Sequence, residues 1–597
     1  MDGSANPRGF LGVERSLLGK RWRERNGDAR LGLTLAQRLG VPEIVGRILA
    51  GRGVIESEAE RFLAPTLRDA LPDPLSFKGM EQAVARIVDA VRGGETIAVF
   101  GDYDVDGATA SALLKRFLES AGGNVRVYIP DRQREGYGPN APALLKLKAE
   151  GAAIVITVDC GVTAFAPLAA AADAGLDVVV VDHHVAEPTL PRAVAVINPN
   201  RLDESGAHGN LAAVGVAFLL AVAINRALRQ AGHYATRTEP DLMTLLDLVA
   251  LGTVCDVVPL TGLNRALVAQ GLKVMRQRRN TGIAALADTA RLAERIDAYH
   301  AGFILGPRVN AGGRVGAADL GTRLLSTEDV IEARQIAAEL DRLNDERRAI
   351  EARVLEEAIA QVEASDTKAP LIFVANAGWH PGVIGIVASR LKERYGRPAL
   401  VAAIENGIAK GSGRSVTGVA LGAAVIAARQ AGLLVNGGGH AMAAGFTVET
   451  GKLEALRDFM AARVAEALDG QEPMPELGID GALACAAATP EFAALVERLA
   501  PFGTGNAEPR FALANLRVLR ATVVGQDQAH VSCVLGDGAG AGRIKAIAFR
   551  ALEGALGPAL LRSQGAGFHI AGHIRADNWQ GREGVQLLID DAAPALG

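Results

Sequence analysis

Apolar runs alternate with segments of helical spacing between residues 80 and 200. The apolar, β-branched runs, which predict strands, lie at 97–100, 125–129, 154–158, 178–181 and 194–197. The segments between them predict helices at 80–92, 108–121, 141–150 and 162–175. This alternation is typical of a parallel sheet whose two faces are covered by helices. Ligands of such sheets bind beyond the carboxyl ends of the strands.

A single long helix is predicted over residues 327–364. The stretch from Ser326 to Asp329 is similar to a capping box, and no glycine or proline interrupts the segment that follows. Apolar residues recur along it at helical spacing. At about 1.5 Å per residue, this helix is ~57 Å long. We interpret it as a connector between two large domains. A coiled-coil dimer is the alternative, although the apolar spacing is not a clean heptad.

Residues 210–280 are predicted to be mostly helical. Two regions after the connector follow other patterns. After the connector, the pattern predicts strands near 371–375, 399–404 and 408–414, and helices near 382–394, 418–431 and 451–468. This indicates a smaller α/β domain. The last region has β-like runs at 510–519, 529–535, 543–549, 567–576 and 584–590, with a helical patch at 550–562. Five strands and one helix match the composition of an OB-fold.

The length of the chain predicts several domains. At about 150 residues per domain, 597 residues correspond to three or four. We expect an α/β protein with a helical N-terminal extension packed on the next domain (1–75), a parallel-sheet domain (76–325), the connector helix (326–368), a smaller α/β domain (369–468) and a C-terminal β domain with an OB-fold (469–597).

Composition restricts the class of protein. Apolar residues make up 49% of the chain, which indicates a globular protein, and the net charge is −4. Any contact with nucleic acid must therefore be a local basic groove. The four cysteines form no CxxC pair, which argues against a zinc ribbon or a disulfide framework. The longest apolar run, Leu211–Ile224, is too short to span a bilayer. We expect a soluble, cytoplasmic protein that binds no membrane.

Three aspartates directly follow the first predicted strand. Asp102, Asp104 and Asp106 occupy alternate positions after the run 97–100. Like charges this close repel one another, and each costs free energy if it is partly buried. A divalent cation is the simplest way to hold them together. The alternative is a solvated acidic turn.

More acids and two histidines end neighbouring strands. Asp159 follows the run 154–158, and Asp182, His183 and His184 follow the run 178–181. Because parallel strands share their carboxyl edge, we expect these residues to meet Asp102, Asp104 and Asp106 at one edge. An isolated acid in an apolar stretch, Asp256, should be paired or metal-bound. Carboxylates with one imidazole suit Mn²⁺ or Mg²⁺ better than zinc. This number of ligands suits two metal ions that share one carboxylate. Two ions ~3.5–4 Å apart are suited to the hydrolysis of phosphoesters.

The ordered motifs resemble a known family. The segments 102–107 (Asp-Tyr-Asp-Val-Asp-Gly), 158–161 (Val-Asp-Cys-Gly), 182–184 (Asp-His-His) and Asp256 resemble the four motifs of the DHH phosphoesterase superfamily. The segments 308–314, 378–385, 411–415 and 437–440 resemble the DHHA1 region of the RecJ exonucleases, and 501–509 resembles the start of their OB domain. The resemblance covers about residues 15–592 in the right order, and this ordered set is specific.

The resemblance implies an enzyme, a metal-dependent exonuclease. It would degrade single-stranded DNA in the 5′→3′ direction with Mn²⁺ or Mg²⁺, release 5′-mononucleotides and serve DNA repair and recombination. Asp104 and Asp159 would hold one ion, and Asp106, Asp159, His183 and Asp256 the other. His184 would face the scissile phosphate, so that His184, Asp159 and Asp106 are the expected catalytic residues. Asp102 and Asp182 would orient ligands. Related proteins have a histidine where this chain has Phe100, and Asp102 would substitute for it as a ligand.

The resemblance also implies a site for the 5′-phosphate. Arg132 follows the second strand and so lies at the same sheet edge, and Ser412 and Arg414 would face it from the smaller domain. Arg308 and Arg314 are further candidates, with a surface ion pair as the alternative for each arginine. His440 would contact a phosphate or a base, or serve as a turn residue. Trp579 would stack on a base or pack in a hairpin.

Other functions stay open at this point. One is a hydrolase of short oligonucleotides or cyclic dinucleotides from the same superfamily. The other is a non-catalytic scaffold that binds single-stranded DNA. The OB-like region favours a long polymer, and the complete set of acids and histidines argues against a decayed site. The expected partner is single-stranded DNA with a 5′ end. We expect a monomer, with a helicase and a single-strand-binding protein as candidate partners.

Overall fold

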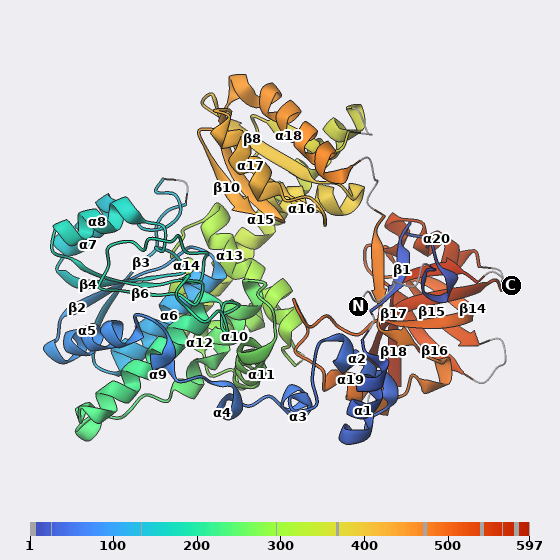
Figure 1. Cartoon of the computed structure of the whole chain (residues 1–597). Coiled ribbons are helices and arrows are strands. Elements are labelled where there is room, and N and C mark those ends of the chain that lie inside the picture. Colours follow the sequence, from blue (N-terminus) through green and yellow to red (C-terminus); the bar gives the residue numbers. More distant parts are fainter. Residues whose placement is uncertain are drawn as a thin grey trace.

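The chain forms a large α/β domain, a smaller α/β domain and a β-barrel, joined as Figure 1 shows. The computed structural model describes residues 8–25, 27–132, 134–293, 295–365, 369–469, 474–537, 542–563, 565–577 and 584–595. Trp579 lies outside the described residues. The mixed α/β class predicted from the sequence is confirmed.

The large α/β domain contains the predicted parallel sheet. Its strand order is β3-β2-β4-β5-β6, and every pair is parallel. The strands are β2 Thr96–Phe100, β3 Asn124–Tyr128, β4 Ala152–Val158, β5 Asp177–Val181 and β6 Ala195–Ile197. One face packs on α5 Met80–Gly93, α6 Val105–Ser120 and α9 Ala213–Gln230, and the other on α7 Ala141–Ala149 and α8 Phe165–Asp173. The apolar runs therefore lie in a sheet buried on both faces.

The rest of this domain is helical. They are α10 Leu246–Cys255, α11 Gly262–Met275, α12 Thr281–Thr289, a π-helix His300–Leu305, α13 Gly306–Val315 and α14 Leu320–Ser326. The predicted apolar run lies in α9, which by length and composition alone could cross a membrane. However, 72% of that helix is buried inside the structure, as is usual for a core helix of a globular domain.

The long connector helix is confirmed as α15, Val330–Ala364. Its N-cap is Asp329, whose carboxylate accepts N–H bonds from Ile331 at 2.7 Å and Glu332 at 3.3 Å. The first half contributes Ile336 and Leu340 to the core of the large domain. The second half contributes Val354, Ala358 and Val362 to the core of the smaller domain. The apolar stripe is therefore buried within one chain, as a connector requires.

The smaller domain is a five-stranded mixed sheet with helices on both faces. Its order is β10-β11-β9-β8-β7. The strands are β7 Ile372–Asn376, β8 Ala399–Glu405, β9 Ile408–Arg414, β10 Asn436–His440 and β11 Ala443–Glu449. One face packs on α16 Ile384–Tyr395, and the other on α17 Leu421–Gln430 and α18 Leu453–Leu468. The hairpin β10–β11 is a strand pair that the sequence did not predict.

The unpredicted hairpin is explained by its glycines. Strand β10 reads Asn-Gly-Gly-Gly-His, which lacks the branched side chains that favour strands. A Cβ atom on Gly437 would lie 2.9 Å from side-chain atoms of Leu434 and Val425. Close packing against α17 therefore requires glycine, and pairing with β11 holds the segment extended.

The C-terminal region is a closed barrel, so the predicted OB-fold is confirmed. Its strands are β14 Phe511–Val524, β15 His530–Asp537, β16 Arg543–Ala548, β17 Gly567–Asp577 and β18 Gly584–Pro594. Strand β14 pairs with both β15 and β17, which closes the sheet. Helix α20, Leu556–Leu561, lies between the third and fourth strands of the barrel. Helix α19, Pro490–Glu497, and the short strand β13, Gly481–Ala482, precede the barrel.

The N-terminal segment packs on this barrel, so the expected packing on the next domain is wrong for most of it. Strand β1, Arg21–Glu24, pairs in parallel with β12, Glu476–Ile479. Trp22 is fully buried, and its Nε1 donates to Asp591 at 3.1 Å. Helices α1 Ala29–Leu39 and α2 Glu43–Gly51 share a core with the barrel. A local pattern cannot reveal which distant surface an amphipathic helix covers.

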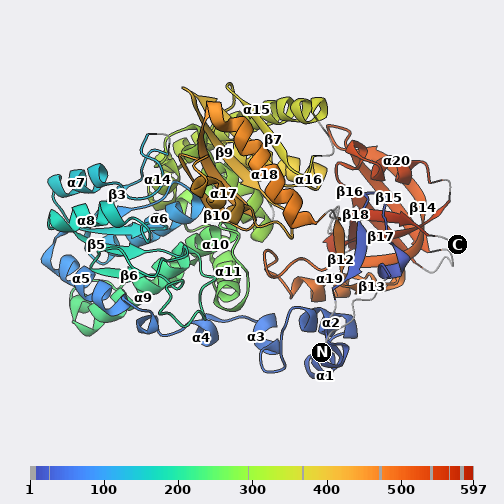
Figure 2. The ribbon, with the colours of Figure 1, turned by 45° about the horizontal axis from the view of Figure 1, so that its top comes forward.

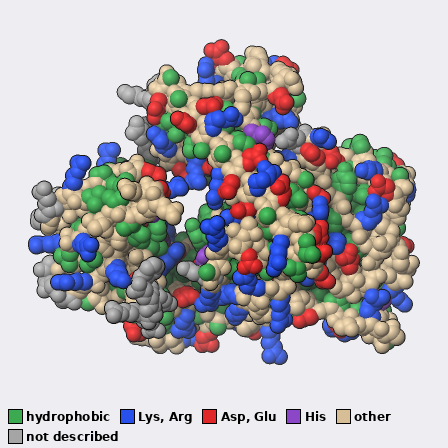
Figure 3. Space-filling view, turned by 180° about the vertical axis from the view of Figure 1, so that it is seen from behind, with side chains coloured by type: hydrophobic (Ala, Val, Ile, Leu, Met, Phe, Trp, Pro, Cys, Tyr) green, Lys and Arg blue, Asp and Glu red, His purple; other side chains and the backbone are tan. Residues whose placement is uncertain are grey.

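A linker then runs from the barrel back to the large domain. It contains α3 Ala59–Leu63 and α4 Leu67–Ala70, and Figures 1 and 2 both show it along one edge of the molecule. Arg265 of the large domain is buried and donates to the carbonyls of Phe62 at 2.9 Å and Ala500 at 2.8 Å. This one side chain therefore joins the linker, the large domain and the segment before the barrel. Figure 3 shows, from behind, an opening between the barrel and the other two domains.

Candidate metal centre and phosphate site

Three acidic clusters meet at the carboxyl edge of the sheet. They follow β2, β4 and β5, which are neighbours in the strand order, so their ends lie side by side. Three sets of side chains have ligand atoms that all lie within 4.8 Å of one another. They are Asp102, Asp104 and Asp159; Asp106, His183 and Asp256; and Asp159, His183 and His184. The structure therefore brings together every metal ligand that the sequence predicted.

Backbone groups fix two of the aspartates. Asp104 caps α6 and accepts the N–H of Gly107 at 3.0 Å. Asp106, in the first turn of α6, accepts the N–H groups of Ala213 at 2.6 Å and Val214 at 2.9 Å. Those donors belong to the first turn of α9, where the helix dipole favours a negative charge. Asp106 is thus a buried carboxylate held rigidly between two helix ends.

His183 is oriented by a carbonyl oxygen. Its Nδ1 lies 3.1 Å from the carbonyl oxygen of Leu211, so this nitrogen carries the proton. Its Nε2 lies 3.2 Å from Asp159 and 3.9 Å from Asp106. Burial, and then the charge of His184, lower the pKa of His183 to about 4. A neutral Nε2 therefore faces two carboxylates, which is unfavourable unless a cation lies between them.

The carboxylates themselves call for a cation. Burial, followed by repulsion from Asp104, raises the pKa of Asp106 to about 7 and that of Asp159 well above its usual range. Burial and repulsion from Asp106 raise the pKa of Asp256 to about 9. One carboxylate oxygen each of Asp102 and Asp256 is buried without a hydrogen-bond partner within the described structure. Oxygen ligands with one imidazole fit Mn²⁺ or Mg²⁺.

This arrangement predicts a pH effect in chelator. The raised pKa means that folded protein holds the Asp256 proton more tightly than unfolded protein does, so stability without metal falls as pH rises from about 4 to about 9. Asp256→Asn removes this ionisation. We expect the variant in chelator to melt above the wild type by roughly 2–4 °C at alkaline pH, with a smaller difference near pH 5.

The control is the same melting series with Mn²⁺, which should stabilise the wild type more than Asp256→Asn because the variant has lost a ligand. Thermal melts at several pH values measure both effects. A difference in chelator that does not change with pH would contradict the ionisation of Asp256.

Asp182 positions His184. The Asp182 carboxylate accepts the N–H groups of Val162, His183 and His184 at 2.8–3.1 Å, and lies 2.7 Å from Nδ1 of His184. Burial alone would lower the pKa of His184, but the hydrogen bond to Asp182 outweighs it and raises the pKa. The contact with Asp182 holds the His184 ring through Nδ1. Asp182 thus orients His184, whereas the family resemblance implied that it would orient metal ligands.

Tyr137 is a site residue that the sequence reasoning missed. Its hydroxyl donates to the backbone carbonyl of Asp159 at 2.9 Å and lies 3.3 Å from Nδ1 of His184. More than half of the residue is exposed. The available signal was its place between Gly136 and Gly138, both of which have positive φ and so form a tight loop at the sheet edge.

A cationic cavity lies across from the metal centre. It has a volume of about 440 Å³ and lies between the two α/β domains, where Arg132, Arg314, Ser412, Arg414 and the start of α16 line it. Arg414 donates to the Ser412 hydroxyl at 3.1 Å, and Arg314 to the carbonyl of Gly382 at 2.9 Å. In the described part of the chain, neither Arg314 nor Arg414 pairs with a carboxylate. Both arginines are therefore available to an anion.

Local packing holds this cavity open to a small anion. A Cβ atom on Gly385 would lie 3.1 Å from Oγ of Ser412 and 3.3 Å from a guanidinium nitrogen of Arg414. Glycine thus lets the first turn of α16 approach these two side chains. Burial, and then Arg132, lower the pKa of Arg314 to about 10. Arg132 itself lies 4.9 Å from the ring of Tyr103.

Two predicted substrate residues lie elsewhere. Arg308 donates to Asp341 at 2.8 Å and to the carbonyl of Ile304 at 2.8 Å, which ties α13 to the connector helix. His440 ends strand β10 and is exposed. Neither lines the cationic cavity. Contact of these two residues with a substrate stays a prediction.

Comparison with known families agrees with this architecture. Residues 96–253 match the N-terminal domain of the DHH family, residues 368–466 match the DHHA1 domain, and residues 479–591 match the RecJ OB domain. These three matches fall on the large α/β domain, the smaller domain and the barrel. The sheet edge with the metal centre belongs to the first of them.

Individual relatives match over most of the chain. The single-stranded-DNA-specific exonuclease RecJ of Bacillus subtilis is 35% identical over 96% of this chain and 71% of its own length. That of Escherichia coli is 36% identical over 93% of this chain and 96% of its own length. A crystal structure of RecJ from Thermus thermophilus in complex with Mn²⁺ superposes with a TM-score of 0.80 at 30% identity, covering 98% of this chain and 80% of that one. The chain therefore belongs to the RecJ exonuclease family.

Proposed function

We propose that this chain is a metal-dependent exonuclease that degrades single-stranded DNA from the 5′ end and releases 5′-mononucleotides, in DNA repair and recombination. The observation that carries the proposal is the cationic cavity lined by Arg132, Arg314, Ser412 and Arg414, across the domain boundary from the acidic sheet edge. A terminal phosphate bound in that cavity would leave the first phosphodiester near the metal centre. Relatives named as single-stranded-DNA-specific exonucleases support the substrate class.

Two ions fit the ligand sets. Asp104 and Asp159 would hold one ion, with Asp102 as a third ligand in place of the histidine that relatives have at Phe100. Asp106, Asp159, His183 and Asp256 would hold the other, so that Asp159 is the shared carboxylate. The membership of Asp159 in two of the three ligand groups supports this assignment. When bound, a pair of divalent ions supplies Lewis-acid activation and a nucleophile at neutral pH.

The side chains around the ions would complete the chemistry. His184, whose pKa the hydrogen bond to Asp182 raises, would in its protonated form donate from Nε2 to an oxygen of the scissile phosphate and offset its charge. Tyr137 would hold the backbone of Asp159. Arg132, Arg314 and Arg414 would bind the terminal phosphate through charge-assisted hydrogen bonds, and Ser412 would add a hydroxyl. Binding and orientation of the chain end would therefore precede cleavage.

End-labelled DNA tests the proposal. Single-stranded, duplex and dinucleotide substrates, labelled at either end, are incubated with Mn²⁺ and the products are separated. We expect the 5′ label to be released first, as a mononucleotide, and from single strands only. Release of the 3′ label first would contradict the proposed polarity. Preferential hydrolysis of dinucleotides would favour a hydrolase of short oligonucleotides, and binding without hydrolysis would favour a scaffold.

The cellular setting is a further part of this proposal. The chain would act in the cytoplasm as a monomer, which the burial of the connector stripe within one chain supports. A helicase and a single-strand-binding protein would supply and protect its substrate. Pull-down from cells that contain tagged protein, with and without nuclease treatment, would separate direct partners from those held by DNA.

A further inference from the structure

Aromatic side chains are rare on the surface of this chain. Among the described residues, the phenylalanines and tyrosines that are more than half exposed are Tyr137, Tyr299, Phe303 and Phe549. Tyr137 belongs to the metal centre, and Phe549 lies on the barrel. Tyr299 and Phe303 lie together in the large domain and have no role in the site described above. Adjacent exposed apolar side chains are candidates for a binding surface.

Tyr299 and Phe303 form a preorganised pair. Their ring centroids are 5.2 Å apart and the ring planes are inclined by 27°, so the rings are stacked. Phe303 is 68% exposed, and His300, which follows Tyr299, is fixed by Asp297 at 2.6 Å. The pair lies at a π-helix, an irregular form that is frequent at functional sites. Two stacked rings that face solvent offer a flat apolar surface without further rearrangement.

The pair lies beside a predicted metal ligand. The π-helix packs on the end of α10, where Cys255 lies 3.5 Å from the carbonyl oxygen of Ala301. The next residue along α10 is Asp256, and Val257 after it has a positive φ of 61° and is 66% exposed. The aromatic pair and the Asp256 carboxylate are thus presented by two segments in direct contact. The pair is therefore carried by a segment that packs on the one that ends in Asp256.

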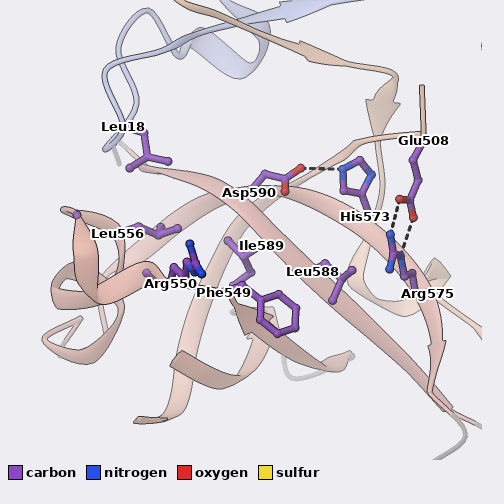
Figure 4. A pocket seen from close by; sticks show the side chains of 12 residues that line it. Leu18, Glu508, Phe549, Arg550, Leu556, His573, Arg575, Leu588, Ile589 and Asp590 are labelled. Carbon is purple, nitrogen blue, oxygen red and sulfur yellow. Dashed lines mark hydrogen bonds and ion pairs between the residues drawn. The ribbon is translucent and has the colours of Figure 1, made fainter. Parts of the chain in front are cut away.

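The same segment also reaches the barrel. Arg295 forms an ion pair with Glu497 of α19 at 3.1 Å. On the barrel, Glu508 holds Arg575 by two hydrogen bonds at 2.6 and 2.8 Å, which Figure 4 shows. These bonds raise the pKa of Arg575, and Asp297 and Tyr299 of the large domain add to the effect across the boundary. Arg575 is therefore a cation held in place on the barrel.

The barrel surface around Arg575 is itself hollow. A cavity of about 380 Å³ is lined by Phe549, Arg550, His573 and Arg575, and also by Asp590 and Glu508, which pair with His573 and Arg575 as Figure 4 shows. Cations with an exposed aromatic ring are the usual surface for single-stranded nucleic acid. This barrel face and the aromatic pair lie on the two sides of one domain boundary.

We propose that Tyr299 and Phe303 form a stacking platform for the bases of the DNA strand between the metal centre and the barrel. This inference rests on the proposed function, because it takes the substrate to be single-stranded DNA. Stacking accepts every base, so the platform holds the strand without reading its sequence. A protein docked on the pair would block the same boundary, which favours DNA as the occupant.

The test measures binding of a 5′-phosphorylated single strand of about 16 nucleotides, the upper site size of one OB-fold. Binding is followed by fluorescence anisotropy in chelator, so that no hydrolysis occurs. Abasic positions are placed one at a time along the strand. We expect Phe303→Ala to weaken binding about tenfold, and Phe303→Trp to restore it. In the wild type, an abasic site at one or two positions of the strand should cause a similar loss of affinity. In Phe303→Ala, an abasic site at those positions should cause no further loss of affinity.

The control variant is Ile331→Ala, because Ile331 is also 68% exposed and lies outside every site described above. It should bind as the wild type does. The platform is refuted if Phe303→Ala binds the normal strand as tightly as the wild type does. It is also refuted if the substitution lowers the affinity for normal and abasic strands by the same factor, wherever the abasic site is placed. If the wild type hydrolyses no single-stranded DNA in the end-label assay, the proposed function fails instead. The two failures are therefore distinguishable.

Discussion

We expect Asp159→Ala to abolish hydrolysis of single-stranded DNA and to leave the chain folded. Asp159 is the carboxylate that both proposed ions would share, so its loss should lower the rate by more than about 10³-fold. The backbone hydrogen bond from Asp159 to the carbonyl of Val181, at 3.0 Å, does not depend on the side chain. Removing a buried charge also relieves repulsion from Asp104 and Asp106.

A second variant separates chemistry from backbone strain. Asp159 has a positive φ of 61°, a conformation that alanine adopts at a cost of roughly 1–2 kcal/mol and that asparagine tolerates better. Asp159→Asn should therefore melt no lower than the wild type in chelator and be equally inactive. Initial rates with Mn²⁺ and thermal melts measure the two properties. Metal-dependent activity that survives in either variant would refute the bridging role.

Arg414→Ala should selectively impair use of phosphorylated 5′ ends. Its guanidinium lines the cationic cavity, pairs with no carboxylate in the described part of the chain and is fixed by Ser412. Loss of a charge-assisted hydrogen bond is worth about 1.5–3 kcal/mol, or roughly 10- to 100-fold in kcat/KM. We expect this loss with 5′-phosphate ends and a much smaller one with 5′-hydroxyl ends. Arg414→Lys should recover only part, because lysine cannot bind a phosphate through two parallel bonds.

Arg429→Ala provides the matched control, since Arg429 is an exposed arginine of the same domain on α17. It should leave both substrates unaffected. Anisotropy with a circular single strand measures internal binding separately from end recognition. An equal loss for phosphorylated and hydroxyl ends in Arg414→Ala would count against a 5′-phosphate site.

The parts of the fold that depend on local pattern were predictable. Strand β4 is a seven-residue apolar run, and α15 has both an N-cap and an uninterrupted helical stripe. The metal centre was predictable for a related reason. Carboxyl ends of parallel strands must share an edge, so Asp104, Asp159 and His183 could be brought together without knowing the strand order.

The parts that depend on distant contacts were not predictable. Strand β10 has no strand-forming side chains and exists because β11 and α17 enclose it. The glycines on either side of Tyr137 indicate a tight loop, but only the fold brings its hydroxyl to Asp159. Arg308 sits in a motif that suggested substrate contact, whereas its partner Asp341 lies on the connector helix. In each case the deciding neighbour is on another element.

The pairing of the N-terminal strand with the segment before the barrel has a consequence for biosynthesis. Arg23 and Glu476, which pair across β1 and β12, are 453 residues apart in the chain. At about 5–20 residues per second, roughly 20–90 s pass between the synthesis of the two strands. During that interval the apolar faces that carry Trp22, Leu35 and Leu49 have no barrel to cover them. This segment, which is made long before its partner, is therefore among the last to fold, and it is where chaperones should engage the nascent chain.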